Sequence, residues 1–195
     1  LQDFREVEGT FTKVASIEMI EAIGEPLLPA FFETVDRVLA PGGRACIQSI
    51  LIPDARYRRY RSSPDWIERH VFPGSFIPSI AAMLAAKARS TDLALVHLED
   101  FGPSYARTLH AWRERFMARR EEAVRLYDER FARMWEFYLA ASEMSFRKQN
   151  LMNFQIQLTK RQGVVPMTRD YIANEEARLR GKERNARPRL QIAGE

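Results

Sequence analysis

Two glutamates, Glu18 and Glu21, stand directly after a short apolar run and could bring carboxylate chemistry to one place in the fold. The run, residues 14–17 (VASI), is predicted to form a short buried strand, and Gly24 ends the segment. In open α/β sheets, ligands bind in the crevice at the carboxyl ends of the strands, so acids placed there are candidates for holding a ligand. The alternative is that both glutamates are solvated in a strand-to-helix connection, because glutamate side chains are usually exposed.

The elements that would position these acids form a strand–helix–strand unit. Pro26 stands near the start of a predicted helix, where its missing N–H does no harm. The helix has one apolar face and ends at the Pro-Gly-Gly of residues 41–43. Residues 44–52 are almost continuously apolar, as in a parallel strand covered on both faces. The unit predicts the second half of a doubly wound α/β sheet with a right-handed crossover.

A segment rich in arginine and aromatic residues, 53–69, follows this unit. It is predicted to be either a solvated, partly helical insertion or a mobile lid that meets anionic headgroups at a membrane surface. Beyond it, the sequence predicts a helix at 79–89, a strand at 93–101 and a last strand at 151–158 at an antiparallel edge of the sheet.

Two long helices, 104–125 and 128–147, are predicted between the last two strands. Each carries an aromatic stripe at helical spacing, which on periodicity alone indicates a core-facing surface. The first stripe includes Tyr105 and Trp112, and the second includes Trp135, Tyr138 and Ser142.

Composition limits the class of protein. With 195 residues, 46% of them hydrophobic and 29% charged, the chain is one folded domain or a large part of one. A single cysteine, Cys46, fits a reducing cytoplasm, and the three histidines lack metal-ligand spacing, so no metal site is predicted. Residues 161–195 carry eight Lys/Arg and five Asp/Glu, so most of the net charge of +4 lies in this tail. The near-neutral body disfavours nucleic-acid binding.

Five segments together carry a resemblance to a known family. They are SIEMIEAIG (16–24), LAPGG (39–43), PDWIERHVFPG (64–74), LEDFGPSYARTLHAWRERF (98–116) and YDERFARMWEFYLAASEMSFR (127–147). In this order and spacing the chain resembles the cyclopropane-fatty-acyl-phospholipid synthase family of S-adenosylmethionine-dependent methyltransferases. The resemblance covers residues 1–160 and implies the C-terminal portion of a Rossmann-like class I methyltransferase sheet with an inserted helical lipid-binding lid. Residues 161–195 would be a basic tail, partly helical or disordered.

The activity that the resemblance implies is transfer of a methyl or methylene group from S-adenosylmethionine to a cis double bond of an unsaturated phospholipid acyl chain. A carbocation forms on the chain, and loss of a proton gives a cyclopropane or a methyl-branched product. In the family, a bicarbonate ion is thought to be the base. Such an enzyme would be cytoplasmic and peripheral at the inner membrane surface, with acyl chains as its partners.

The resemblance also implies roles for single residues. Glu21, Tyr105 and the backbone N–H of Ile50 would hold bicarbonate, and Gln48 stands where many members carry a histidine ligand. An amide still donates a hydrogen bond to an anion, although proton handling could differ. Gln2 and Asp3 would lie near the adenosyl part of the cofactor. Trp135, Tyr138 and Ser142 would face the acyl chain, with Ser142 in the place of a cysteine in many members.

The family's N-terminal half, with its Gly-rich cofactor turn and first strands, has no counterpart in the sequence, where G-x-G-x-x-G does not occur. Residues 1–195 alone are therefore expected to bind the cofactor poorly. The alternative function is a non-catalytic truncated remnant or interaction fragment of such an enzyme. An exposed sheet edge and a lid would also favour association into a homo-oligomer.

Overall fold

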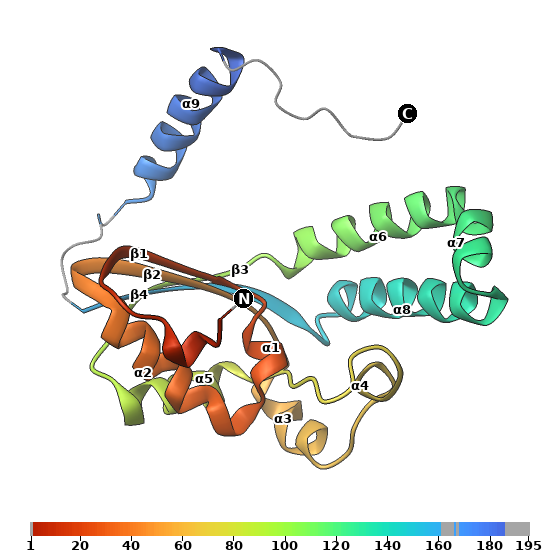
Figure 1. Ribbon diagram of the computed structural model, residues 1–195, viewed down its shortest axis with the longest axis horizontal. Coiled ribbons are helices and arrows are strands. Elements are labelled where there is room, and N and C mark those ends of the chain that lie inside the picture. The colour runs from red at the N-terminus through yellow and green to blue at the C-terminus, as the bar shows by residue number, and fades with distance from the viewer. Residues whose placement is uncertain (1, 161–165, 167, 186–195) are drawn as a thin grey trace. The chain divides into compact units, whose positions relative to one another are not determined.

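A four-stranded mixed sheet forms the centre of residues 1–162, the first of two compact units in the computed structural model of this chain. The structure describes residues 2–160, 166 and 168–185. The strands are β1 (Phe11–Ile17), β2 (Leu39–Leu51), β3 (Ala94–Asp100) and β4 (Met152–Thr159), in the order β1-β2-β4-β3 (Figure 1). β1 and β2 run parallel, while β4 is antiparallel to both β2 and β3. This arrangement confirms the predicted α/β class.

Two strand predictions need correction, one in its place in the sheet and one in its burial. The last strand, β4, is antiparallel but lies inside the sheet, because Ile156 pairs with Ile47 of β2 on one side and with Leu98 of β3 on the other. The predicted buried strand at residues 14–17 lies in β1, which is mostly exposed, and Ile17 is 69% exposed. Within the described residues β1 pairs only with β2, so one edge of β1 has no strand partner.

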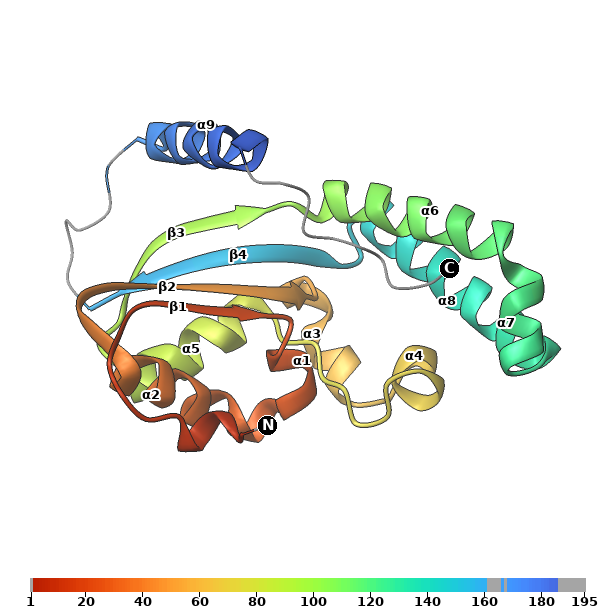
Figure 2. The ribbon, with the colours of Figure 1, turned by 45° about the horizontal axis from the view of Figure 1, so that its top comes forward.

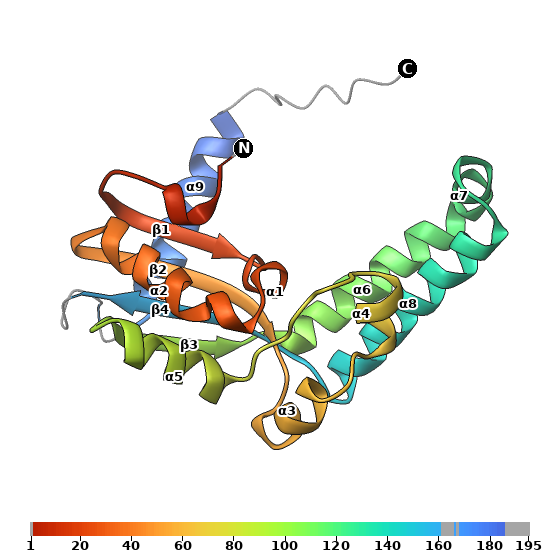
Figure 3. The ribbon, with the colours of Figure 1, turned by 60° about the horizontal axis from the view of Figure 1, so that its bottom comes forward.

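Two helices, α2 (Leu28–Val38) and α5 (Ile80–Ser90), cover one face of the sheet (Figures 2 and 3). Short turns η1 (Phe4–Glu6), α1 (Ile20–Ile23) and η2 (Glu25–Leu27) complete this layer. The core between helices and sheet is apolar and closed. It includes Phe31, Phe32, Ile47, Met83, Ile156 and Leu158, each no more than 2% exposed.

A helical arm follows β3 and returns to β4. It consists of α6 (Gly102–Ala118), α7 (Arg120–Leu126) and α8 (Glu129–Arg147), with α6 and α8 side by side (Figure 1). The helix predicted at 104–125 is interrupted at Arg119, whose backbone (φ −119°, ψ 22°) leaves the helical region. The two aromatic stripes meet in a second small core around Leu109, Leu139 and Phe146.

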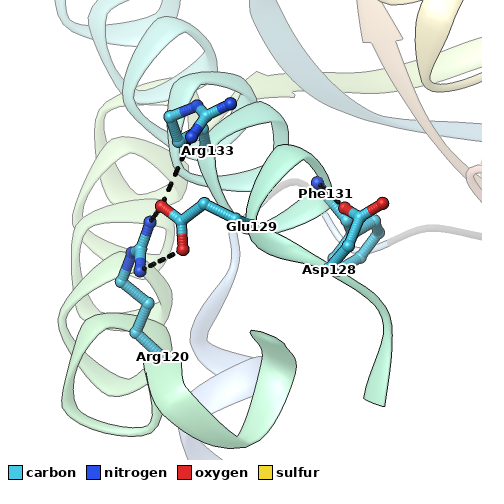
Figure 4. A network of polar contacts seen from close by, with 5 residues as sticks. All are labelled: Arg120, Asp128, Glu129, Phe131 and Arg133. Carbon is cyan, nitrogen blue, oxygen red and sulfur yellow. Dashed lines mark hydrogen bonds and ion pairs between the residues drawn. The ribbon is translucent and has the colours of Figure 1, made fainter. Parts of the chain in front are cut away.

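The start of α8 is fixed by the polar contacts in Figure 4. The Asp128 carboxylate accepts a hydrogen bond from the backbone N–H of Phe131 at 2.6 Å and so caps the helix. Glu129, one residue on, pairs with Arg120 of α7 and with Arg133 of α8. The turn between α7 and α8 is therefore held from both sides.

Removing this cap should weaken the arm. We expect Asp128→Ala to lower the free energy of unfolding by about 1 kcal/mol, because an unsatisfied N–H remains at the start of α8. Chemical denaturation followed by circular dichroism measures the change. Asp92→Ala, an exposed aspartate before β3, is the control, and equal effects of the two substitutions would contradict the assignment.

The segment between β2 and α5 folds into α3 (Asp54–Arg61), α4 (Trp66–His70) and an apolar loop. It contacts the arm through aromatic pairs: Trp66 meets Phe137 with ring centroids 4.7 Å apart, and Phe72 meets Tyr138 at 5.7 Å. The segment is therefore packed against α8, and its role as a lid remains a prediction.

The second unit contains α9 (Asp170–Asn185), a mostly exposed helix. The expected disordered end of the tail lies outside the described residues, and the assignment of 1–160 and 161–195 to different roles remains a prediction. Among the helices that the structure describes, none is long and apolar enough to cross a bilayer.

Candidate active site

A pocket of about 600 Å³ lies at the carboxyl ends of β1 and β2. The end of β1 supplies Glu18, α1 supplies Glu21, and β2 supplies Ile50. The arm closes the pocket with aromatic side chains from α6 and α8, and the loop before α5 closes it with apolar ones. These walls include Phe72, Pro73, Tyr105, Leu109, Trp112, Tyr138 and Phe146. The lining combines two carboxylates with an apolar and aromatic wall.

Glu18 joins four elements through its carboxylate. Its Oε1 accepts hydrogen bonds from the side-chain amides of Gln48 on β2 at 3.1 Å and Asn153 on β4 at 3.0 Å. Its Oε2 accepts from the hydroxyl of Tyr105 on α6 at 3.1 Å. Its backbone has φ 51°, a left-handed conformation that is uncommon for a residue other than glycine. Backbone and side chain together direct the carboxylate at the meeting point of the sheet and the arm.

Glu21 is held differently. Its Oε1 accepts from the Ser49 hydroxyl at 2.9 Å and from the Ile50 backbone N–H at 2.5 Å. Its Oε2 is buried and has no hydrogen-bond partner in the described part of the chain. Burial raises the pKa of Glu21, the hydrogen bonds oppose this shift, and the nearby charge of Glu18 adds to it.

The raised pKa of Glu21 predicts a pH-dependent contribution to stability. The folded state holds the Glu21 proton more tightly than the unfolded state, so Glu21 stabilises the fold most at acid pH. This contribution is lost as the pH rises from the ordinary glutamate range through the raised pKa. The difference in unfolding free energy, wild type minus Glu21→Gln, should therefore fall between acid and neutral pH. Urea titrations at both pH values measure it, and a difference that rises with pH would contradict the burial argument.

Tyrosines in the pocket keep their protons. Burial, followed by the charge of Glu18, raises the pKa of Tyr105 far above its ordinary value. Burial likewise raises the pKa of Tyr138. Both phenols are therefore hydrogen-bond donors at neutral pH, and neither is a base.

The structure brings five of the predicted site residues to this pocket: Glu21, Ile50, Tyr105, Tyr138 and Ser142. Gln48 does not line the pocket, but its side-chain amide donates to Glu18, which does. The side-chain oxygen of Gln48 accepts a hydrogen bond from the Gln155 amide at 3.3 Å. The roles predicted for these residues remain predictions.

Three predicted residues lie elsewhere. Trp135 packs within α8 between Phe131 and Tyr138 and does not line the pocket. Gln2 and Asp3 lie at η1, where Asp3 caps the turn and pairs with Arg5. Their neighbour Phe4 lines a second, apolar groove of about 490 Å³ along β1. The cofactor role of Gln2 and Asp3 stays a prediction.

The sequence did not indicate two residues of this network, Ser49 and Asn153. Glu18 was a candidate as an acid at a strand end, but its place at the centre of the polar network was not predicted. Ser49 and Asn153 are both fully buried. Apart from their positions in predicted strands, nothing in the sequence indicated a role for them in the site. Among the described residues, no group of three His, Cys, Asp or Glu side chains could hold a metal ion.

The donor set decides which small groups the site suits. Two carboxylates and several aromatic faces fit a cation such as a sulfonium, since no lysine, arginine or histidine is among the described lining residues. A separate bicarbonate ion does not fit, because its three expected donors are engaged. Tyr105 and Gln48 donate to Glu18, and the Ile50 N–H donates to Glu21.

Comparison with known proteins places the chain in one family. A family model described as mycolic acid cyclopropane synthetase matches residues 1–156. Tuberculostearic acid methyltransferase UfaA1 of Mycobacterium tuberculosis is 42% identical over 161 residues, which are 82% of this chain and 38% of that protein. Cyclopropane-fatty-acyl-phospholipid synthase of Escherichia coli is 31% identical over 160 residues, 82% of this chain and 40% of that protein. The chain thus spans about two-fifths of the length of these relatives.

Solved structures support the fold. Cyclopropane synthase MmaA2 of Mycobacterium tuberculosis superposes with a TM-score of 0.73 at 22% identity, covering 81% of this chain and 58% of that one. Mycolic acid cyclopropane synthase CmaA1, in a complex with SAH and CTAB, gives a TM-score of 0.72 at 20% identity, with the same two coverages of 81% and 58%. The predicted Rossmann-like class I methyltransferase fold is therefore confirmed.

Proposed function

Because the chain belongs to the mycolic acid cyclopropane synthetase family, we propose that it carries the lipid-modifying pocket of an S-adenosylmethionine-dependent methyltransferase. The substrate would be a cis double bond in an unsaturated phospholipid acyl chain. The product would be a cyclopropane or a methyl-branched chain, formed through a carbocation. The enzyme would work in the cytoplasm at the inner membrane surface, where such acyl chains are reached.

One observation carries the proposal: two carboxylates at the strand ends open into a pocket that is otherwise apolar and aromatic. Apolar walls suit an acyl chain, and aromatic faces attract a carbocation without reacting with it. When bound, S-adenosylmethionine would supply the methyl group. Glu18 and Glu21 would offset the positive charge, while Tyr138, Ser142 and Phe146 would contact the chain.

The test is the mass spectrum of membrane fatty acids from cells that express the 195-residue chain. In parallel, cells express the product of the complete reading frame. Unsaturated chains that gain the mass of one CH₂ group support the proposal, and a gain with the short chain as well would overturn the expectation that it binds the cofactor poorly. The control for the expression level is the Tyr127→Phe variant, because Tyr127 is exposed on the arm.

The alternative is a non-catalytic fragment that associates with another polypeptide, and the edge of β1 favours it. That edge has no strand partner among the described residues, and the apolar groove beside it is lined by Val14, Phe31 and Val35. Such a fragment would leave the fatty acids unchanged in both expression strains.

A further inference from the structure

Glu18 combines an uncommon backbone conformation with a carboxylate that accepts three hydrogen bonds. Its backbone adopts φ 51°, one of two such non-glycine conformations among the described residues, the other being Gln149 at φ 53°. Its side chain is tied to three elements besides its own strand. A left-handed backbone at a half-buried glutamate is kept where the surrounding structure over-determines it, and such positions cluster at functional sites.

Two of the donors around Glu18, Tyr105 and Gln48, are among those expected to hold a separate anion. The Tyr105 hydroxyl and the Gln48 amide each lie 3.1 Å from a Glu18 oxygen. Asn153 adds a third donor at 3.0 Å. A carboxylate offers about four acceptor positions, so these three donors leave room for one more proton. All three donors are neutral, and Glu18 forms no ion pair in the described part of the chain.

The geometry points to Glu18 as a built-in base: its carboxylate takes the place of a separate bicarbonate ion and accepts the proton that the lipid carbocation loses. This inference rests on the methyl transfer proposed above. It gives Glu18 the role of a catalytic residue and gives Tyr105, Gln48 and Asn153 the role of positioning its carboxylate.

Each bond, electron pair and proton in the methyl transfer and the later proton loss belongs to the lipid, the methyl donor or Glu18. The double bond's electron pair forms a bond to the sulfonium methyl carbon, and the electrons of the broken C–S bond stay on sulfur. The neighbouring lipid carbon becomes positively charged. Glu18 then takes a proton from the added carbon or from an adjacent CH₂ group. The released C–H electrons close a ring or form a new double bond, and Glu18 becomes a neutral acid that later returns its proton to water.

Glu21 is less suited to this step. Its Oε1 already accepts two hydrogen bonds, and its Oε2 is buried beneath protein atoms. A proton on the lipid chain in the pocket therefore meets Glu18 rather than the free oxygen of Glu21. Glu21 instead fixes the end of β2 through Ser49 and Ile50.

Glu18→Gly is the informative variant, because glycine adopts φ 51° without strain and the fold should persist. It removes the carboxylate and frees the three donors for an added anion. The matched control is Gln149→Gly, which makes the same backbone change at an exposed position outside the pocket. Both variants are made in the 195-residue chain and in the product of the complete reading frame.

Methyl transfer to unsaturated phospholipid vesicles is measured in buffer freed of carbon dioxide and in buffer with added bicarbonate. We expect the wild type and Gln149→Gly to be insensitive to bicarbonate. Without bicarbonate, the methyl-transfer rate of Glu18→Gly should be about 100-fold or more below the wild-type rate, which is the range of general base catalysis. Added bicarbonate should raise the rate of this variant about tenfold or more. A wild type that needs bicarbonate, or a Glu18→Gly variant that keeps full activity without it, would overturn the inference.

Direct binding separates this inference from the proposed function. Line broadening of isotopically labelled bicarbonate, followed by NMR, should be absent with the wild type and present with Glu18→Gly. Equal binding by both proteins overturns the claim that Glu18 fills the anion's place, whether or not the protein is active. Absence of methyl transfer by the wild type at every bicarbonate level overturns the proposed function, and with it the catalytic role of Glu18.

Discussion

Replacing Tyr105 with phenylalanine should lower the rate of methyl transfer about 10- to 100-fold while the fold remains intact. The Tyr105 hydroxyl donates at 3.1 Å to Glu18 across the junction of α6 and β1. A hydrogen bond to a charged group contributes about 1.5–3 kcal/mol, which corresponds to that range of rates. The ring remains in phenylalanine, so the contacts with Phe101 and Phe146 persist. Initial rates with labelled S-adenosylmethionine measure the effect.

The matched control is Tyr127→Phe, since Tyr127 is 68% exposed. It should transfer methyl groups at the wild-type rate. Equal rates for Tyr105→Phe and Tyr127→Phe would show that the hydroxyl of Tyr105 does not serve the reaction. A loss accompanied by an altered circular dichroism spectrum would instead assign Tyr105 to the stability of the arm.

Leu158→Ala should lower the free energy of unfolding by about 2–5 kcal/mol. Leu158 is fully buried on β4, the strand that pairs with β2 and β3. Removing its side chain leaves a cavity in the buried core between the sheet and the α2–α5 layer. Denaturant unfolding monitored by tryptophan fluorescence measures the loss.

Leu126→Ala is the control for this prediction. It removes the same atoms from a leucine side chain, but Leu126 is 77% exposed. We expect Leu126→Ala to alter the unfolding free energy by less than about 0.5 kcal/mol. Similar losses for the two variants would contradict the burial of Leu158 in the core.

Local pattern predicted most elements of the fold but not the place of β4. Alternation of apolar and polar residues in residues 151–158 is equally compatible with an edge and an inner strand, and only pairing with β3 decides between them. The Pro-Gly-Gly predicted to end the helix lies inside β2, because α2 ends at Val38 and β2 begins at Leu39. The pairing of β2 with β1 is irregular there, since Phe11 pairs with Leu39 but Lys13 pairs with Arg44. The helix break at Arg119 was not predicted either, because no proline or glycine stands near it in the sequence.

The candidate site was predictable in part for a similar reason. Glu21 and Tyr105 came from segments with a family resemblance, and the structure places both in one pocket. The network of Glu18 could not be predicted, because its partners Gln48, Tyr105 and Asn153 are 30, 87 and 135 residues away in the sequence. The positive φ of Glu18 also contradicts the local preference of glutamate.

S-adenosylmethionine with a deuterated methyl group tests directly whether the protein methylates an unsaturated acyl chain. The protein is incubated with vesicles of a monounsaturated phospholipid. The fatty acids are then released, and their masses are determined by mass spectrometry. We expect the unsaturated chain to gain one carbon bearing two or three deuterium atoms and a saturated chain to gain none. Unchanged fatty acids with the product of the complete reading frame would contradict this expectation.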